Sequence, residues 1–151
     1  MTTFRLTILS AAALVAVGIT TAPWPSDATA GPACSGPRFT VTSGWVLDAT
    51  TKLKWQQPFG TGRTWDQAKA DCTALGSGAR LPSLTELQTI VDDSKNSPPI
   101  DLVAFPSTPS SAFWTSSVVS GSPGSAWIVY FYKGSTDYFP VSDAIAVRCV
   151  R

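Results

Sequence analysis

Apolar and polar residues alternate loosely along residues 39–55, with the period of two that is typical of strands having one buried face. The segment 48–52 interrupts the alternation with small and polar residues that favour a turn. The pattern therefore predicts a hairpin, and its apolar members are Val41, Trp45, Leu47, Leu53 and Trp55.

A helical pattern starts at Thr64. This residue is a suitable N-cap, and Gln67 stands three positions later, where its side chain can return to the cap in a capping box. Glycines at positions 76 and 78 predict the end of the helix. Apolar side chains recur at the three- and four-residue intervals of one helix face: Trp65, Ala68, Cys72 and Leu75.

A second helix has an equally clear start. Ser83 is followed three residues later by Glu86, the spacing of a capping box, and Pro82 keeps the preceding chain extended. The residues expected on the buried face of this helix are Leu84, Leu87, Ile90 and Val91.

Prolines and serines dominate residues 92–124, where little periodicity remains apart from an apolar run at 112–116. We interpret this region as a long ordered loop containing one short strand. Alternation returns in two further strands at 126–133 and 144–150, with Gly134 as a turn. The order of hairpin, helices, long loop and strands predicts one α+β domain over residues 39–151, with two helices packed on antiparallel sheets.

Charge and composition narrow the function classes. The net charge is +1 and charged residues make up 14% of the chain, which argues against a nucleic-acid partner or an electrostatically bound membrane surface. The chain has no histidine, so the commonest general base and the commonest zinc ligand are missing. We expect no cofactor and no catalytic residue.

The amino-terminal segment 1–30 has the features of a signal peptide. Arg5 supplies the positive charge, an apolar stretch covers residues 6–19, and Ala28-Thr29-Ala30 is a suitable cleavage site. The apolar stretch is shorter than the roughly 20 residues that cross a bilayer, so a transmembrane anchor is disfavoured. We expect a secreted or periplasmic protein that starts at Gly31, with a flexible tail at residues 31–38 and no membrane attachment after cleavage.

Three cysteines in an exported chain leave one over. A bond between Cys72 and Cys149 would tie the first helix to the last strand, and Cys34 would then be free or bonded to another molecule. A bond from Cys34 to either of the others would leave an odd thiol inside the domain, which fits an oxidising compartment less well. The residues alone leave these pairings open.

Five strings occur together in the order found in one bacterial domain family. They cover almost all of the expected mature chain and lie at residues 46–56, 64–72, 80–87, 113–117, and 126–127 with 147–151. The Arg-Leu-Pro-x-x-x-Glu-Leu string at 80–87 and the Val-Arg-Cys-Val-Arg string at 147–151 are specific when they occur together. In these strings the chain resembles the family named for the carboxyl-terminal domain of Legionella collagen-like protein, which has a C-type-lectin-like fold.

The resemblance implies a disulfide bond between Cys72 and Cys149, and it places Arg80 and Glu86 in the structural signature rather than in catalysis. Two departures concern local turns. Lys52 stands where family members usually place glycine, and Gly78-Ala79 replaces a common Asp-Trp pair before the arginine.

The fold resemblance and the loop composition together predict a non-catalytic binding module for a glycan or a protein partner. Aromatic rings stack on sugar faces and give rigid contact area, so aromatic residues near the long loop are candidate contacts. Trp114 suits a core position better than a ligand contact, whereas Tyr132 and Tyr138 suit either. The candidate ligand-binding residues are Trp114, Tyr130, Tyr132, Asp137 and Tyr138.

Three other activities have less support in the sequence. Calcium needs several converging oxygen ligands, and the aspartates are too dispersed to predict a metal site. The alternative function is an enzyme distantly resembling the formylglycine-generating oxidases, which need a reactive cysteine near the carboxyl end, where this chain offers only Cys149. A glycosidase pair of Glu86 with Asp92 or Asp93 competes with the capping role of Glu86. Oligomeric state and ligand identity do not follow from the sequence.

Overall fold

The computed structural model describes residues 37–151. The predicted signal peptide (1–30) and all but the last two residues of the predicted tail (31–38) lie outside the described residues. No helix in the described part is both long and apolar enough to cross a bilayer. Arg38, which the sequence assigned to the tail, is held to the domain, because its guanidinium pairs with Asp48 at 2.9 Å and donates to the carbonyl oxygen of Thr89.

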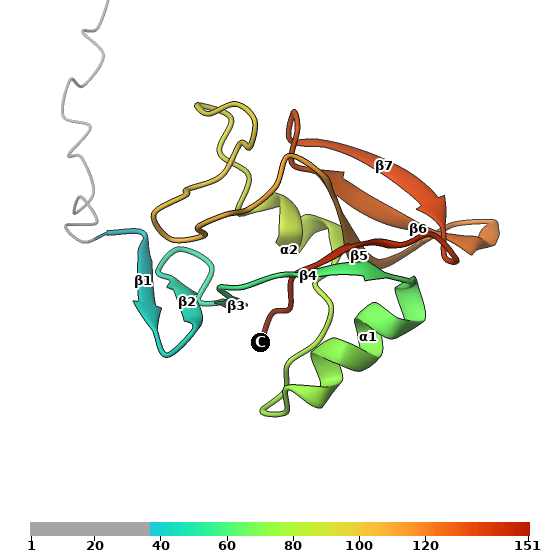
Figure 1. Cartoon of the computed structure of the whole chain (residues 1–151), viewed down its shortest axis with the longest axis horizontal. Coiled ribbons are helices and arrows are strands. Elements are labelled where there is room, and N and C mark those ends of the chain that lie inside the picture. Colours follow the sequence, from blue (N-terminus) through green and yellow to red (C-terminus); the bar gives the residue numbers. More distant parts are fainter. Residues whose placement is uncertain (1–36) are drawn as a thin grey trace, which may run out of the picture. The chain divides into compact units, whose positions relative to one another are not determined.

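Three short strands form a small antiparallel sheet in the order β1 (Phe39–Thr42), β2 (Trp45–Asp48) and β3 (Lys54–Gln56), drawn in cyan in Figure 1. The predicted hairpin corresponds to β2 and β3. A second, tighter hairpin between β1 and β2 was not predicted. Its turn residues Ser43 and Gly44 have positive φ values of 50° and 77°, a combination that suits a two-residue hairpin turn.

Five strands form the second sheet, in the order β4-β8-β5-β6-β7. Their bounds are Gly60–Arg63 (β4), Ala112–Val119 (β5), Ser122–Tyr130 (β6), Ser135–Pro140 (β7) and Ile145–Val147 (β8). Strands β5 and β8 run parallel, so the prediction of purely antiparallel sheets is wrong at this pair.

The strand prediction also misplaced several boundaries in this sheet. Strand β5 continues past the expected short strand at 112–116 to Val119, and β6 already starts at Ser122, so the end of the predicted loop 92–124 is a hairpin. Strands β4 and β7, at the two edges, were not predicted. Their sequences, Gly-Thr-Gly-Arg and Ser-Thr-Asp-Tyr-Phe-Pro, lack the alternation of a half-buried strand, because edge strands bury little surface.

Both predicted helices are present. Helix α1 covers Trp65–Ala74 and helix α2 covers Leu84–Gln88, and each begins with the predicted capping box, at Thr64 and at Ser83. Helix α2 is only five residues long, so Ile90 lies beyond its end, yet it is buried as expected. Leu75, expected on the buried face of α1, is 43% exposed, because the chain leaves the helix at this residue.

The five-stranded sheet has a hydrophobic core on each face. Phe113 of β5 lies opposite Val129 and Ala146, and all three belong to the first core cluster. The next residue, Trp114, lies opposite Ile128, and both belong to the second cluster. Successive strand residues face opposite sides, so one strand supplies both cores.

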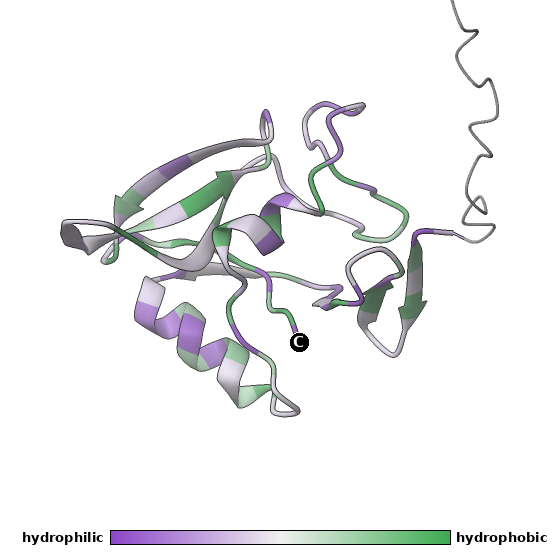
Figure 2. Ribbon diagram, turned by 180° about the vertical axis from the view of Figure 1, so that it is seen from behind, coloured by the Kyte–Doolittle hydropathy of each residue, from purple (hydrophilic) through white to green (hydrophobic). Residues whose placement is uncertain are grey.

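Each helix covers one of these cores. Leu87 of α2 belongs to the first cluster, together with Val46 and Trp55 of the small sheet. Ala68 and Cys72 of α1 belong to the second. Figure 2 shows the result, with polar (purple) segments prominent on α1 and apolar (green) segments in the strands. The sheet is therefore a central layer whose two faces are both buried.

Candidate functional site

The predicted disulfide bond between Cys72 and Cys149 is present. It joins α1 to the segment after β8, with 5.3 Å between the Cα atoms and a sequence separation of 77 residues. Both cysteines are buried in the second core. Closing a loop of this length stabilises a fold by about 4 to 5 kcal/mol in the chain-entropy model.

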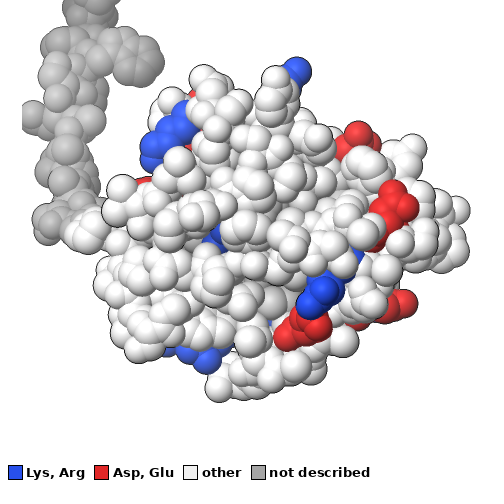
Figure 3. Space-filling model, viewed as in Figure 1, with Lys and Arg blue, Asp and Glu red and all other residues white. Residues whose placement is uncertain are grey.

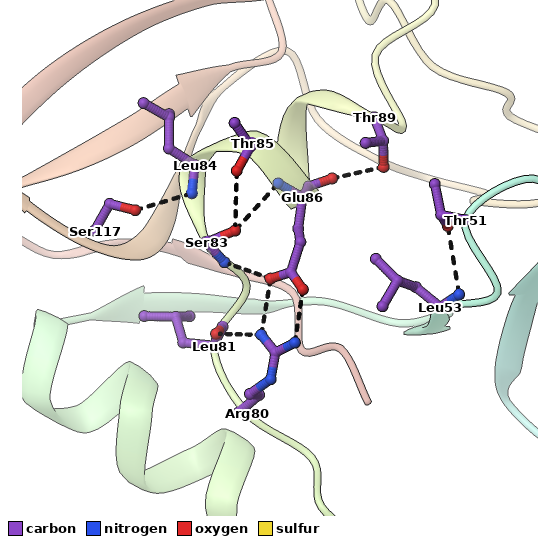
Figure 4. A network of polar contacts seen from close by, with 10 residues as sticks. All are labelled: Thr51, Leu53, Arg80, Leu81, Ser83, Leu84, Thr85, Glu86, Thr89 and Ser117. Atoms are coloured by element: carbon purple, nitrogen blue, oxygen red, sulfur yellow. Dashed lines mark hydrogen bonds and ion pairs between the residues drawn. The ribbon is translucent and has the colours of Figure 1, made fainter.

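Arg80 and Glu86, which both belong to the 80–87 string, form an ion pair, shown in Figure 4. The two guanidinium nitrogens donate to the two carboxylate oxygens at 2.8 and 2.6 Å, and a Glu86 oxygen also accepts from the backbone N–H of Ser83 at 2.8 Å. The hydrogen bonds from Arg80 lower the pKa of Glu86 to about 2. A carboxylate held ionised in this way caps and anchors α2, as the sequence predicted.

Arg148 is fully buried and has no carboxylate partner among the described residues. Its guanidinium donates to the carbonyl oxygens of Gln56 and Gln57 at 2.9 and 2.6 Å and to the Thr108 hydroxyl at 2.8 Å. Burial lowers its pKa to about 9. Arg148 thus joins the end of β3, the long loop and the last strand, which is a structural task.

The candidate contact Trp114 is a core residue. Its side chain has no exposed surface, and its indole Nε1 donates to the carbonyl oxygen of Arg63 at 2.8 Å. An enclosed ring offers no face to a ligand, so the prediction that Trp114 binds ligand is corrected. The ring is buried because Trp114 lies on the face of β5 that packs against α1.

The other four candidates lie on the β6–β7 ribbon or in the turn between its two strands. Asp137 lies opposite Ile128, so it shares one face of the ribbon with Tyr130, and Tyr132 meets Tyr130 edge to face at 6.4 Å between ring centroids. Tyr138 belongs to the other face, where it packs against Trp127 at 5.7 Å. The three tyrosines are 37–53% exposed. The structure therefore brings two of the tyrosines together and does not unite the four residues in one site.

A different region has the geometry of a binding site. The outward face of the small sheet forms a hollow of about 270 Å³, which we call the Trp45 hollow. Strand alternation sends Trp45 and Leu47 to this face and Val46 to the core. The lining residues are Thr40, Thr42, Ser43, Trp45, Leu47, Lys54 and Arg151.

Two basic residues, Lys54 and Arg151, line the Trp45 hollow. The Arg151 guanidinium carbon lies 4.0 Å from the centroid of the Trp45 ring, in the range of a cation–π contact. A second hollow of about 430 Å³ shares Lys54 and Arg151 and adds Lys52 and Ser77. No aspartate or glutamate is among the residues that line either hollow. Figure 3 shows basic (blue) and acidic (red) atoms in small separate groups on a largely uncharged face.

The sequence held a signal for this site that was not used. Trp45 and Leu47 are among the apolar members of the predicted hairpin, but Val46, between them, is the fully buried residue. Trp45 and Leu47 alternate with Val46 and Asp48, so the pattern identified two faces without saying which one is buried. Arg151 joins the site because its backbone pairs with Lys54 at 2.9 Å, a contact between residues far apart in the sequence.

No group of three or more Asp, Glu, Cys or His residues is arranged to hold a metal ion within residues 37–151. Asp92 and Asp101 line one hollow, together with Arg38. Cys149 is bonded to Cys72, so it has no thiol to react. The residues that line the Trp45 hollow offer groups for noncovalent contact: an aromatic ring, hydroxyl groups and cations.

Comparison with known proteins gives a match to one family model. No curated protein matches the chain. The family model described as the Lcl C-terminal domain matches residues 44–151. The matched segment includes both bonded cysteines, the Arg80–Glu86 pair and most of the Trp45 hollow. The chain therefore belongs to the Lcl C-terminal domain family.

Proposed function

We propose that the chain is an exported, non-catalytic binding module with a C-type-lectin-like fold, and that the Trp45 hollow binds its ligand. One observation carries the proposal: Trp45, Lys54 and Arg151 converge on a single concave surface. Ligand sites are concave and combine apolar or aromatic walls with a few placed polar groups. The Trp45 hollow has that composition, whereas the β6–β7 tyrosines are divided between two faces of a ribbon.

The chemistry of the hollow favours a glycan that carries negative groups. An indole ring suits the apolar face of a sugar ring. The hydroxyl groups of Thr40, Thr42 and Ser43 can donate to or accept from sugar hydroxyls. Lys54 and Arg151 attract carboxylate or sulfate groups, and no acidic residue in the lining opposes them. The second candidate is a protein partner whose surface has acidic groups to pair with the cations and an apolar area to pack against the indole ring.

The absence of catalysis is part of the proposal. Glu86, the candidate acid for glycoside hydrolysis, pairs with Arg80 and has a pKa of about 2, which keeps it ionised and unable to donate a proton near neutral pH. The alternative of an oxidase would require a free thiol at Cys149, which is bonded to Cys72.

Binding to immobilised polysaccharides tests this proposal. Dextran, dextran sulfate and alginate give a neutral polymer, its sulfated form and a carboxylated polymer. We expect binding to at least one charged polymer, weakening as salt is added, because exposed charge contacts are screened. Trp45→Ala and Arg151→Ala should each weaken binding about tenfold, equivalent to about 1.4 kcal/mol.

Tyr138→Ala is the matched control. Tyr138 is 53% exposed but lies on the β6–β7 ribbon, so its removal should leave polysaccharide binding unchanged. Equal losses in Tyr138→Ala and Trp45→Ala would contradict the choice of site. If none of the three polymers binds, the glycan proposal fails, and a pull-down that depends on Trp45 and Arg151 would instead support the protein partner.

Export is tested separately. The protein purified from the medium or the periplasmic fraction should begin at Gly31, as read by amino-terminal peptide mass mapping. Recovery of the intact amino terminus from the cytoplasmic fraction would contradict a cleaved signal peptide.

A further inference from the structure

A second surface, unrelated to the Trp45 hollow, exposes apolar side chains. Val103 is 90% exposed, and Leu102 and Val41 are 48% and 46% exposed. Monomeric proteins tolerate single exposed apolar residues, but a contiguous group of them marks an interaction surface. These three residues come from the loop after α2 and from β1, segments that are far apart in the sequence.

Two hollows make this group contiguous. One, of about 370 Å³, is lined by Val41 and Phe39 of β1 together with Val103, and the other, of about 390 Å³, is lined by Leu102, Pro98 and again Val103. Val103 is therefore a projecting apolar side chain that borders two hollows. We call this region, with Phe39, Val41, Pro98, Leu102 and Val103, the Val103 surface.

The charges around the Val103 surface have both signs. Arg38 and Asp92 line the first hollow, Lys95 lines the second, and Asp101 lines both. Within one chain Arg38 pairs with Asp48 and Lys95 pairs with Asp92. What a second copy can complement is therefore chiefly the projecting Val103 side chain and the hollow beside it. Two-fold symmetric interfaces use the same patch on both subunits, so each feature of one copy meets its complement on the other.

We propose that the Val103 surface pairs two copies of this chain through a two-fold interface, with Val103 of each copy seated in the hollow beside Val41 of the other. The sequence adds a second, independent indication. Cys34 precedes Pro37, a residue of the same hollow, by three positions, which is at most about 10 Å of chain. With Cys72 and Cys149 bonded to each other, Cys34 is the odd cysteine of the chain, and an odd cysteine in an exported protein points to pairing between molecules.

Light scattering coupled to size-exclusion chromatography, on protein expressed from the full sequence, measures the pairing. Weak complexes have dissociation constants of about 1 µM to 1 mM. As the protein concentration rises across this range, we expect the measured mass to rise from that of one chain towards twice that value. Val103→Asp should remain at the mass of one chain over the same range, because each dimer would bury two carboxylates. Val41→Thr, which keeps a strand-forming residue, should reduce the dimer fraction less.

Val118→Asp is the matched control, because Val118 is 51% exposed and lies on the β5–β6 hairpin. It should dimerise as the unchanged protein does. Near-ultraviolet circular dichroism establishes that each variant is folded. A single-chain mass at every concentration, or equal dimer fractions in Val103→Asp and the unchanged protein, would overturn the proposal.

Cys34 reports proximity in a second experiment. Oxidised glutathione accepts the two electrons and two protons released when two Cys34 thiols join, giving one disulfide between chains and two molecules of reduced glutathione. The linked dimer should form several-fold more slowly in Val103→Asp than in Val118→Asp. Cys34→Ser should still form the noncovalent dimer, and loss of that dimer would show that the cysteine, rather than the Val103 surface, holds the copies together.

Discussion

Arg148 and Arg151 stand three residues apart in the same string, and the molecule uses them in opposite ways. Arg148 is fully buried, and its guanidinium is occupied by two carbonyl oxygens and a hydroxyl group. Arg151 is partly exposed and lies over the Trp45 ring at the wall of a hollow. The first arginine is enclosed and out of reach of a ligand, although its Nε has no hydrogen-bond partner within residues 37–151. The second is accessible to a ligand.

The difference shows that residue type is a poor guide to function in this domain. Both arginines belong to the string that carries the family resemblance, and both lie near aromatic rings. What separates them is the number of fixed hydrogen-bond partners and the access of solvent. The same test separates Trp114, which is enclosed, from Trp45, which lines a hollow.

The largest expected effect comes from removing the covalent tie beside Arg148. Replacing Cys72 and Cys149 together by alanine should lower the free energy of unfolding by about 4 kcal/mol, because the unfolded chain regains the entropy of a long open loop. Urea unfolding followed by tryptophan fluorescence measures this loss. A change of less than about 1 kcal/mol would mean that packing around Arg148 holds the last strand without the bond.

The next effect compares the two arginines directly. Arg148→Ala leaves the carbonyl oxygens of Gln56 and Gln57 and the hydroxyl of Thr108 without their donor, and it leaves a cavity. We therefore expect the free energy of unfolding to fall by about 3 kcal/mol or more. Arg151→Ala should change the free energy of unfolding by less than about 0.5 kcal/mol, as at other surface positions. Equal losses in the two variants, measured by urea unfolding, would break the distinction between a structural and a binding arginine.

A smaller effect concerns Glu86, whose pKa is lowered from 4.5 to about 2 in the folded protein. Its ionised form is favoured by folding, so its contribution is complete above about pH 4.5 and is lost as the pH falls towards 2. Glu86→Gln keeps an acceptor for the capping box but removes the ion pair, and should cost about 1 kcal/mol at pH 7, since Arg80 is half exposed and the pair is screened.

Urea unfolding of Glu86→Gln and the unchanged protein at several pH values provides the check. The difference between the two should shrink from its value at pH 7 as the pH is lowered from about 4.5 to 2. A difference that stays constant over this range would assign the loss to packing of the side chain instead of its charge.

The smallest effect on stability should accompany a change in how binding depends on salt. Lys54→Gln keeps most of the length of the side chain in β3 and removes one charge from the Trp45 hollow. We expect a change in unfolding free energy of less than about 0.5 kcal/mol and a flatter salt dependence of polysaccharide binding, since one exposed charge contact is lost. An unchanged salt dependence would mean that Lys54 makes no charge contact with the polysaccharide.

The local signals in the sequence were informative where a few neighbouring residues decide the outcome. The capping boxes at Thr64 and Ser83 were found because the cap and its partner are three residues apart. Strand β4 was missed because its Gly-Thr-Gly-Arg sequence has no pattern of its own and is ordered by pairing with β8, more than 80 residues away in the chain. The parallel pairing of β5 with β8 is likewise a long-range property.

The sequence by itself determined the two helix starts, the pair of faces on the first hairpin and, through the family strings, the bond between Cys72 and Cys149. Only the tertiary structure decided which face each aromatic residue presents to solvent. Periodicity specifies that Trp45 and Val46 point in opposite directions, but the cluster formed by Leu87, Phe113 and Val129 decides that Val46 turns inward. The physical reason is that local spacing is set by backbone geometry, whereas burial is set by apolar partners that come from distant parts of the chain.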